Sequence, residues 1–191
     1  MKKNKTPVQV ISILDMSGSM APLQSEVVGA YNHFIEEQKK QEGKAEVTLV
    51  MFDNKIITHF DRVNIKKVND ITLNEYKPRG MTALYDAVGK TIDRFSEYKD
   101  VVMIIQTDGQ ENASKIYDQP TLKRLIEQKE KDGWDITFLG ANIDAKAAGS
   151  SIGVALHKSI QYNNTADGLQ EAFACMSAVS VNYRQLKLGE E

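Results

Sequence analysis

Three oxygen-bearing side chains follow the first apolar run of the sequence. In the stretch DMSGS, Asp15, Ser17 and Ser19 alternate with Met16 and Gly18. If this loop stays extended, the alternation points the three oxygen-bearing side chains in the same direction. Three kinds of chemistry fit such a group: a cradle for a phosphate, a phospho-acceptor aspartate, or a metal site that takes further ligands from elsewhere in the chain.

Two later segments can complete a metal site. Asp108 directly follows the apolar run of residues 101–107, and Thr82 lies close to Gly80 at the start of an expected helix. Magnesium takes about six oxygen ligands and often retains waters, so carboxylates and hydroxyls are suitable donors. Gly18 allows the backbone to turn closely around an ion.

The order of apolar segments predicts an α/β protein. Strands are expected where apolar and β-branched residues run together, over residues 8–14, 46–52, 55–63, 101–107, 134–141 and 155–162. Helices are expected where apolar residues recur at helical spacing, around residues 27–38, 84–95, 120–132 and 169–186, with Gly43 placed to end the first of them. Strands that alternate with helices predict a doubly wound, Rossmann-like, mostly parallel six-stranded sheet with helices on both faces. The short Asp53-Asn54 turn makes the third strand an antiparallel edge strand.

This fold class places the candidate residues together. In open α/β sheets, ligands bind beyond the carboxyl ends of the strands, where the strand order reverses. Asp15 follows the first expected strand and Asp108 follows the fourth. We therefore expect the two carboxylates to share one edge of the sheet.

Length and composition indicate one ordinary globular domain. The chain has 191 residues and a formal net charge of −2, so no strong field recruits nucleic acid or an anionic membrane. We expect a single domain over residues 8–188, with tails at 1–7 and 189–191. The one cysteine, Cys175, is expected to be a buried thiol. No apolar run approaches a membrane span, and the basic N-terminus lacks a cleavage site, so we expect a cytoplasmic protein.

Several of these residues also have purely structural interpretations. Thr82 can cap the helix that follows it, and Asp86 and Asp93 on that helix are expected to lie on a solvated face. Met16 and Met20 either fill the core or line a contact rim beside the site.

The segments DMSGSM, GMT and TDG, in this order and between these strands and helices, resemble the von Willebrand factor A (vWA) domain. The resemblance extends from the first expected strand to the closing helix. In that family D-x-S-x-S, a distant threonine and a distant aspartate form the metal-ion-dependent adhesion site (MIDAS). The resemblance implies metal roles, some of them through water, for Asp15, Ser17, Ser19, Thr82 and Asp108.

The function that this resemblance implies is metal-dependent protein binding without catalysis. A bound Mg²⁺, with Mn²⁺ or Ca²⁺ as alternatives, would accept an Asp or Glu carboxylate from a partner protein. The absence of cysteine pairs and of a secretion signal looks closer to intracellular vWA proteins of bacteria and phages. In integrin-type relatives the closing helix shifts when the site changes ligand, which is a hypothesis for residues 169–186 here.

Two other functions stay open from the residues themselves. A phosphatase-type hydrolase could use Asp15 as its nucleophile, although such enzymes carry a second acid two residues later, where this chain has Ser17. Alternatively, the metal is purely structural and ties the strand ends together. Reciprocal linkage separates a structural metal from an adhesive one, because only an adhesive site couples the binding of a carboxylate to the binding of the metal.

Overall fold

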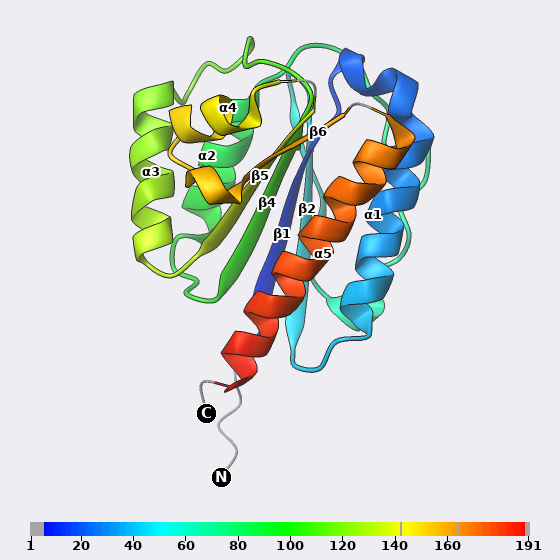
Figure 1. Cartoon of the computed structure of the whole chain (residues 1–191), viewed down its shortest axis with the longest axis vertical. Coiled ribbons are helices and arrows are strands. Elements are labelled where there is room, and N and C mark those ends of the chain that lie inside the picture. The colour runs from blue at the N-terminus through cyan, green and yellow to red at the C-terminus, as the bar shows by residue number, and fades with distance from the viewer. Residues whose placement is uncertain (1–5, 142, 164, 190–191) are drawn as a thin grey trace.

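A computed structural model describes residues 6–141, 143–163 and 165–189. Within them six strands form one sheet in the order β3-β2-β1-β4-β5-β6 (Figure 1). The strands are β1 (Val8–Asp15), β2 (Ala45–Phe52), β3 (Ile56–Asn64), β4 (Val101–Thr107), β5 (Asp135–Ala141) and β6 (Ser159–Tyr162). β3 pairs antiparallel with β2 at the edge, and the other neighbours pair in parallel. The expected mixed sheet is confirmed.

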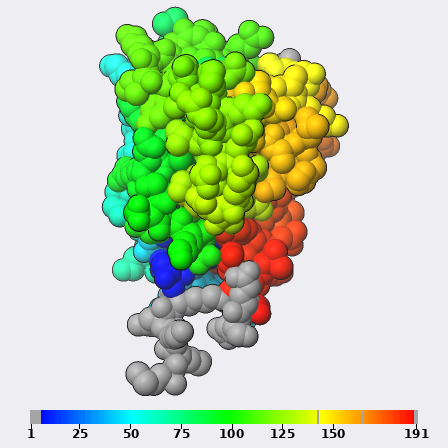
Figure 2. Space-filling view, turned by 90° about the vertical axis from the view of Figure 1, so that its left-hand side faces the viewer, coloured from blue at the N-terminus to red at the C-terminus, as the bar shows by residue number. Residues whose placement is uncertain are grey.

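Helices cover both faces of this sheet. The helices α1 (Gln24–Lys39) and α5 (Ala166–Gly189) lie on one face. The other face carries α2 (Leu84–Phe95), α3 (Gln119–Lys131) and α4 (Ala145–Ser151). Figure 2 shows this second face, where the yellow-green α3 and the yellow α4 lie at the surface. None of the helices within the described ranges is long and apolar enough to cross a membrane.

The central strand β1 separates two hydrophobic cores. Val10 and Leu14 pack with α1 and α5, whereas Ile11 and Ile13 pack with α2 and α3 on the opposite face. All eight residues of β1 are buried. A strand that is covered on both faces needs apolar residues at successive positions, which explains the continuous run in this part of the sequence.

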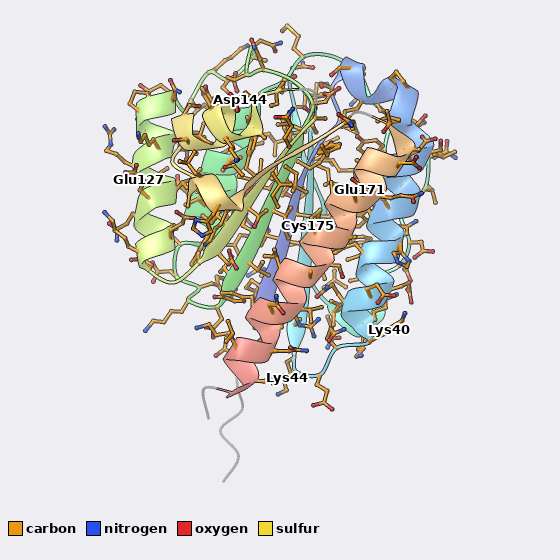
Figure 3. The ribbon with its side chains drawn as sticks, in the orientation of Figure 1. Lys40, Lys44, Glu127, Asp144, Glu171 and Cys175 are labelled. Atoms are coloured by element: carbon orange, nitrogen blue, oxygen red, sulfur yellow. The ribbon has the colours of Figure 1, made fainter. Side chains whose placement is uncertain are left out.

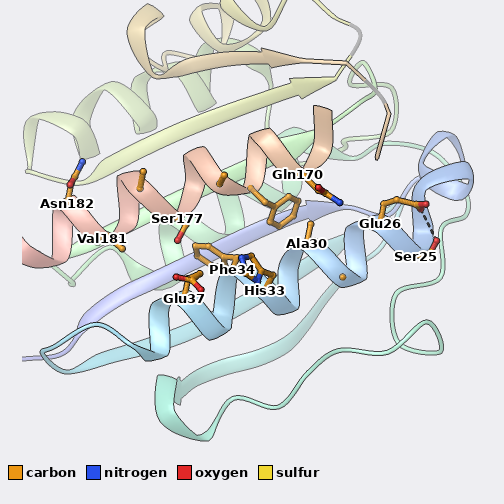
Figure 4. A pocket seen from close by; sticks show the side chains of 14 residues that line it. Ser25, Glu26, Ala30, His33, Phe34, Glu37, Gln170, Ser177, Val181 and Asn182 are labelled. Atoms are coloured by element: carbon orange, nitrogen blue, oxygen red, sulfur yellow. Dashed lines mark hydrogen bonds between the residues drawn. The ribbon is translucent and has the colours of Figure 1, made fainter. Parts of the chain in front are cut away.

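A groove runs along the outer surface between α1 and α5. Its volume is about 1020 Å³, and Figure 4 shows His33 and Glu37 of α1 facing Ser177 of α5 across it. The rings of Phe34 and Phe173 lie beneath it and are almost completely buried. The groove is lined by these two helices alone, so it is separate from the carboxyl-end edge of the sheet.

Several expected boundaries are wrong. The strand expected over 155–162 begins at Ser159, because its pairing with β5 begins at Phe138, and a 3₁₀ turn (Leu156–Lys158) precedes it. The helix α1 ends at Lys39, before Gly43, and α4 is absent from the sequence predictions. Since α4 has the sequence AKAAGSS, it offers no apolar stripe that a periodicity analysis could detect.

The closing helix differs from the expectation at its last turns and at its cysteine. Leu186, the last apolar residue of the expected helix, is 67% exposed, whereas Arg184 two positions earlier is 2% exposed. Residues two apart on a helix lie on roughly opposite sides, so only one of them can face the core. Cys175 is half-buried, whereas a fully buried thiol was expected. The helix also includes Gly189, which was expected in the tail, while residues 1–5 and 190–191 lie outside the described ranges.

Arg184 joins α5 to the end of α1. Its guanidinium donates hydrogen bonds to the carbonyl oxygens of Gln38 (2.7 Å), Glu42 (3.2 Å) and Gly43 (3.3 Å). The Gln38 carbonyl also accepts the N–H of Gln41 at 3.3 Å, and Glu42 and Gly43 lie in the loop after α1, so the charged donor ties the helix end and this loop together. Arg184 thus fixes the C-terminal part of α5 against α1.

Asp86 holds the loop that follows β4. Its Oδ1 accepts the backbone N–H groups of Ile116 and Tyr117 at 2.9 Å each, and its Oδ2 accepts that of Lys115 at 3.0 Å. Asp86 is 7% exposed, so its expected place on a solvated face is wrong. Burial raises the pKa of Asp86, but the three backbone donors outweigh this effect and the pKa lies below its ordinary value.

We expect Arg184→Met to lower the free energy of unfolding by roughly 2 kcal/mol, because three carbonyl oxygens lose a charged donor. Urea denaturation followed by circular dichroism measures this change. Gln185→Met, at an exposed neighbouring position, is the matched control and should shift stability by less than about 0.5 kcal/mol. Equal stability of the two variants would contradict the role of Arg184.

We expect Asp86→Asn to cost roughly 1–3 kcal/mol near neutral pH, because one loop N–H loses its acceptor. The folded pKa of Asp86 lies below its unfolded value of about 3.9, so its charge stabilises the fold above that value. This stabilisation is lost as the pH falls through the folded pKa.

Denaturation at a series of pH values tests this linkage. The difference between the wild-type protein and Asp86→Asn should be constant near neutral pH and should shrink in acid, below about pH 4. Asp70→Asn, at an exposed position, is the control. A difference that stays unchanged in acid would show that the Asp86 carboxylate is not held in this way.

Candidate metal centre

The carboxyl ends of β1 and β4 bring the two expected carboxylates to the same edge of the sheet. These strands are parallel neighbours, and Leu14 is paired with Gln106. Asp15 therefore lies beside Thr107, and Asp108 is the next residue along β4's chain. From β1 the chain builds the sheet outward in both directions, toward β3 and toward β6. The candidate residues therefore lie at the point where the strand order reverses.

The side chain of Asp15 is completely buried and its two oxygens are both engaged. Its Oδ1 accepts the backbone N–H of Ser17 at 2.7 Å, and its Oδ2 accepts the hydroxyl of Thr107. Thr107 Oγ1 in turn accepts the backbone N–H of Gly109 at 3.1 Å. The first turn after β1 and the first turn after β4 are thus joined through this carboxylate.

A chain of hydroxyls connects the first loop to Asp108. The hydroxyl oxygens of Ser17 and Ser19 are 3.1 Å apart, and Ser19 Oγ donates to Asp108 Oδ1 at 2.6 Å. Ser17 is buried, whereas Ser19 is exposed and Asp108 is half-buried. The group therefore runs from the interior at Asp15 to the surface at Ser19.

Thr82 joins this group from a third loop. A Cβ atom built on Gly109 would lie 3.1 Å from Thr82 Oγ1 and 3.7 Å from Asp15 Oδ2, so both oxygens point to the same small space. Asn112 fixes the backbone of Thr82 in both directions: its Oδ1 accepts the Thr82 N–H, and its own N–H donates to the Thr82 carbonyl. The structure thus brings all five predicted residues to one place.

The helix-capping interpretation of Thr82 is wrong. The residue that precedes α2 is Ala83, and α2 has no side-chain cap. Thr82 is 4% exposed, and its hydroxyl is directed toward Asp15. Met16 and Met20 are 1% and 0% exposed, so they fill the core and do not line a contact rim.

Backbone hydrogen bonds hold the first and second loops together. Gly18 N donates to Gly80 O at 3.2 Å, and Arg79 N donates to Met16 O at 2.9 Å. Gly80 has a φ of +69°, and a Cβ atom there would lie 2.3 Å from Asn54 Oδ1, so only glycine fits this position. The DMSGS loop is extended at Ser17 but enters a 3₁₀ helix (Gly18–Leu23), so the expected extended conformation holds for only part of it.

Among the described residues, no basic side chain compensates the buried carboxylate of Asp15. Burial raises the pKa of Asp15 and the charge of Asp108 acts in the same direction, while hydrogen bonds from Thr107 and Ser17 oppose the shift. Within the described ranges Asp15 forms no ion pair with a lysine or arginine, and Arg79 instead pairs with Asp53 at 3.0 Å. A cation at this place would compensate both acidic charges.

The donor set fits a hard divalent cation. Two carboxylates and three hydroxyls offer only oxygen, which is the ligand that Mg²⁺, Mn²⁺ and Ca²⁺ prefer. Within the described ranges no group of three or more His, Cys, Asp and Glu residues is arranged to hold a metal. A metal here must therefore rely on hydroxyls and waters to complete its shell.

Three supporting residues were missed by the sequence analysis. Thr107 stands directly before Asp108 at the end of a buried strand, where a polar residue is a detectable signal. Asn112 and Asp86 act on backbone groups of segments distant in sequence, and no local spacing indicates such contacts.

Comparisons with known proteins identify the fold. No protein-family model and no curated protein sequence matches the chain. Among solved structures, proximal thread matrix protein 1 from the mussel byssus has a TM-score of 0.67 at 16% identity, over 91% of this chain and 46% of the mussel chain. A von Willebrand factor type A protein from Catenulispora acidiphila has a TM-score of 0.66 at 16% identity, over 92% of this chain and 43% of that chain.

A third structure is matched along nearly its whole length. The von Willebrand factor domain of the type V pili tip protein Mfa5 from Porphyromonas gingivalis has a TM-score of 0.67 at 12% identity, over 93% of this chain and 96% of that chain. This chain spans less than half of the mussel and Catenulispora proteins. Another structure of the mussel protein has zinc in its MIDAS motif. Together these likenesses establish that the chain has the von Willebrand factor A fold.

Proposed function

We propose that this protein is a metal-dependent protein-binding module whose bound cation accepts an acidic residue of a partner. The observation that carries the proposal is the buried carboxylate of Asp15, which has no basic side chain as a partner among the described residues and points with Thr82 into the same space. A buried charge without compensation is unfavourable by several kcal/mol, on the order of what a bound cation would recover.

Five residues would hold the cation, directly or through water: Asp15, Ser17, Ser19, Thr82 and Asp108. Because only two of them are charged, they would neutralise a divalent cation without satisfying it fully, so the ion would still attract an outside carboxylate. Small hydroxyl donors and a low ligand charge favour Mg²⁺, with Mn²⁺ and Ca²⁺ as alternatives.

The exposed side of the group supports a protein partner. Ser19 and Gly18 are exposed and Asp108 is half-buried, so an incoming carboxylate could reach this end of the group. Met81, next to Thr82, is 55% exposed and offers apolar contact area beside it. Structures with this fold include a pilus tip protein, a pilus adhesin and a byssus matrix protein, which is consistent with a role in binding other proteins.

Two other proposals rest on the sequence alone: a cytoplasmic location and a bacterial or phage source.

The alternative in which Asp15 attacks a phosphoryl group gains no support from the site. Both oxygens of Asp15 accept hydrogen bonds and the side chain has no exposed surface. A nucleophile must be within reach of its substrate, and the buried side chain of Asp15 is not.

We expect saturable binding of Mg²⁺ and Mn²⁺ to the metal-stripped protein in calorimetric titrations. Asp15→Asn preserves the shape of the side chain but removes its charge, and it should weaken this binding by more than about tenfold. Asp70→Asn removes an exposed charge elsewhere and should leave it unchanged. Wild-type affinity in a folded Asp15→Asn protein, with folding checked by circular dichroism, would refute the site.

We also expect a carboxylate and the metal to bind cooperatively. In the presence of glutarate the affinity for Mg²⁺ should rise, and Mg²⁺ should raise the affinity for glutarate by the same factor, because linkage is reciprocal. Methylammonium chloride at equal ionic strength controls for salt. Metal binding that is indifferent to glutarate would instead favour a purely structural ion.

A further inference from the structure

A side cleft opens next to the candidate metal centre. It lies between the start of α2, residues 109–111 after β4, and α4, and its volume is about 370 Å³. Figure 3 shows Asp144 at the start of α4, at the end of the molecule opposite Lys44. The cleft has room for one long side chain and is too small for a helix or strand.

Gly109 connects this side cleft to the metal centre. Gly109 lines the cleft, and a Cβ atom on it would lie 3.1 Å from Thr82 Oγ1 and 3.7 Å from Asp15 Oδ2. Gly109 therefore borders both the cleft and the candidate metal centre. A peptide that placed a carboxylate at the metal centre would therefore have a neighbouring side chain within reach of the cleft.

The walls of the side cleft are apolar, but its charges are all negative. Leu84, Phe138 and Ile152 form part of its wall. Among the described residues, the charged side chains that line it are those of Glu111 and Asp144, and no lysine, arginine or histidine lines it. Within the described ranges neither carboxylate forms an ion pair.

Both carboxylates are held in place by backbone groups. Glu111 Oε1 accepts the N–H groups of Ala113 and Ser114, at 2.8 and 2.7 Å, and its Oε2 accepts the N–H of Tyr85 at 2.9 Å and the hydroxyl of Ser114 at 2.7 Å. Asp144 Oδ1 accepts the N–H of Ala147 at 2.9 Å and caps α4. These contacts fix where the two carboxylates lie beside the cleft.

We propose that the side cleft binds a lysine or arginine side chain of the same partner. This inference rests on the proposed function, since the acidic residue at the metal centre would bring the basic one to the cleft. The methylene stem of a long basic side chain packs on apolar walls while its charged end faces carboxylates. The partner segment would therefore carry an acidic residue and, within a few positions, a basic one.

Selection from a phage-displayed library of random peptides tests the pairing. Peptides retained by the wild-type protein in Mg²⁺ and released by a chelator should carry an Asp or Glu together with a nearby Arg or Lys. In a selected peptide, replacing the basic residue by alanine should weaken binding by about tenfold. Chelator-released peptides that show no enrichment of basic residues would overturn the inference while leaving the proposed function intact.

Two helix caps provide matched variants. Asp144→Asn retains a good capping residue but removes one charge from the cleft, so the alanine replacement in the peptide should then cost less than about twofold. Asp118→Asn makes the same change at the cap of α3, outside the cleft, and should preserve the tenfold effect. An equal effect in both variants would overturn the inference.

Peptides selected from the same library without the chelator step separate this inference from the proposed function. Binding that needs the basic residue but persists in Asp15→Asn and without Mg²⁺ would support the side cleft and refute metal-dependent recognition. Binding that disappears in Asp15→Asn supports the metal centre, and its response to Asp144→Asn then decides the role of the cleft.

Discussion

The buried carboxylate of Asp15 is the constraint on which the carboxyl-end edge of the sheet depends. A charged group at the end of a strand with no exposed surface requires donors on every side, and three chain segments supply or support them. Ser17 and Thr107 donate directly, and Thr82 lies close enough for its hydroxyl to share the same space. The fold thus holds a hydrogen-bonded negative charge at one point without a compensating basic side chain among the described residues, which favours a cation there.

The surrounding loops hold this arrangement through their backbones. Gly18 and Gly80 join the first two loops, and Asn112 connects the second to the third. Asp86 collects three N–H groups farther along the third loop, which keeps residues 109–118 against α2. Each of these contacts holds a main-chain atom of a loop, so the loops that carry the ligand side chains are fixed in place, as a preorganised site requires.

The architecture and the five candidate ligands could be predicted from the sequence because each has a local signal. Buried parallel strands appear as continuous apolar runs, and DMSGS and TDG stand directly after two of them. What could not be predicted depends on contacts between distant residues. Asp86 looks like an ordinary helix-surface acid until Ile116 and Tyr117 are placed against it, and Arg184 looks exposed until the end of α1 is placed beside it. The small helix α4 has too few apolar residues to leave a periodic pattern.

Arg184 also defines what the closing helix can do mechanically. Its guanidinium engages three carbonyl oxygens, of Gln38, Glu42 and Gly43, which form an acceptor set of fixed shape. A translation of α5 by one helical turn, about 5.4 Å, would take the guanidinium out of reach of all three at once. Sliding of α5 by one turn would therefore break all three hydrogen bonds together. A tilt about this end, in which the N-terminal turns of α5 move most, would keep them.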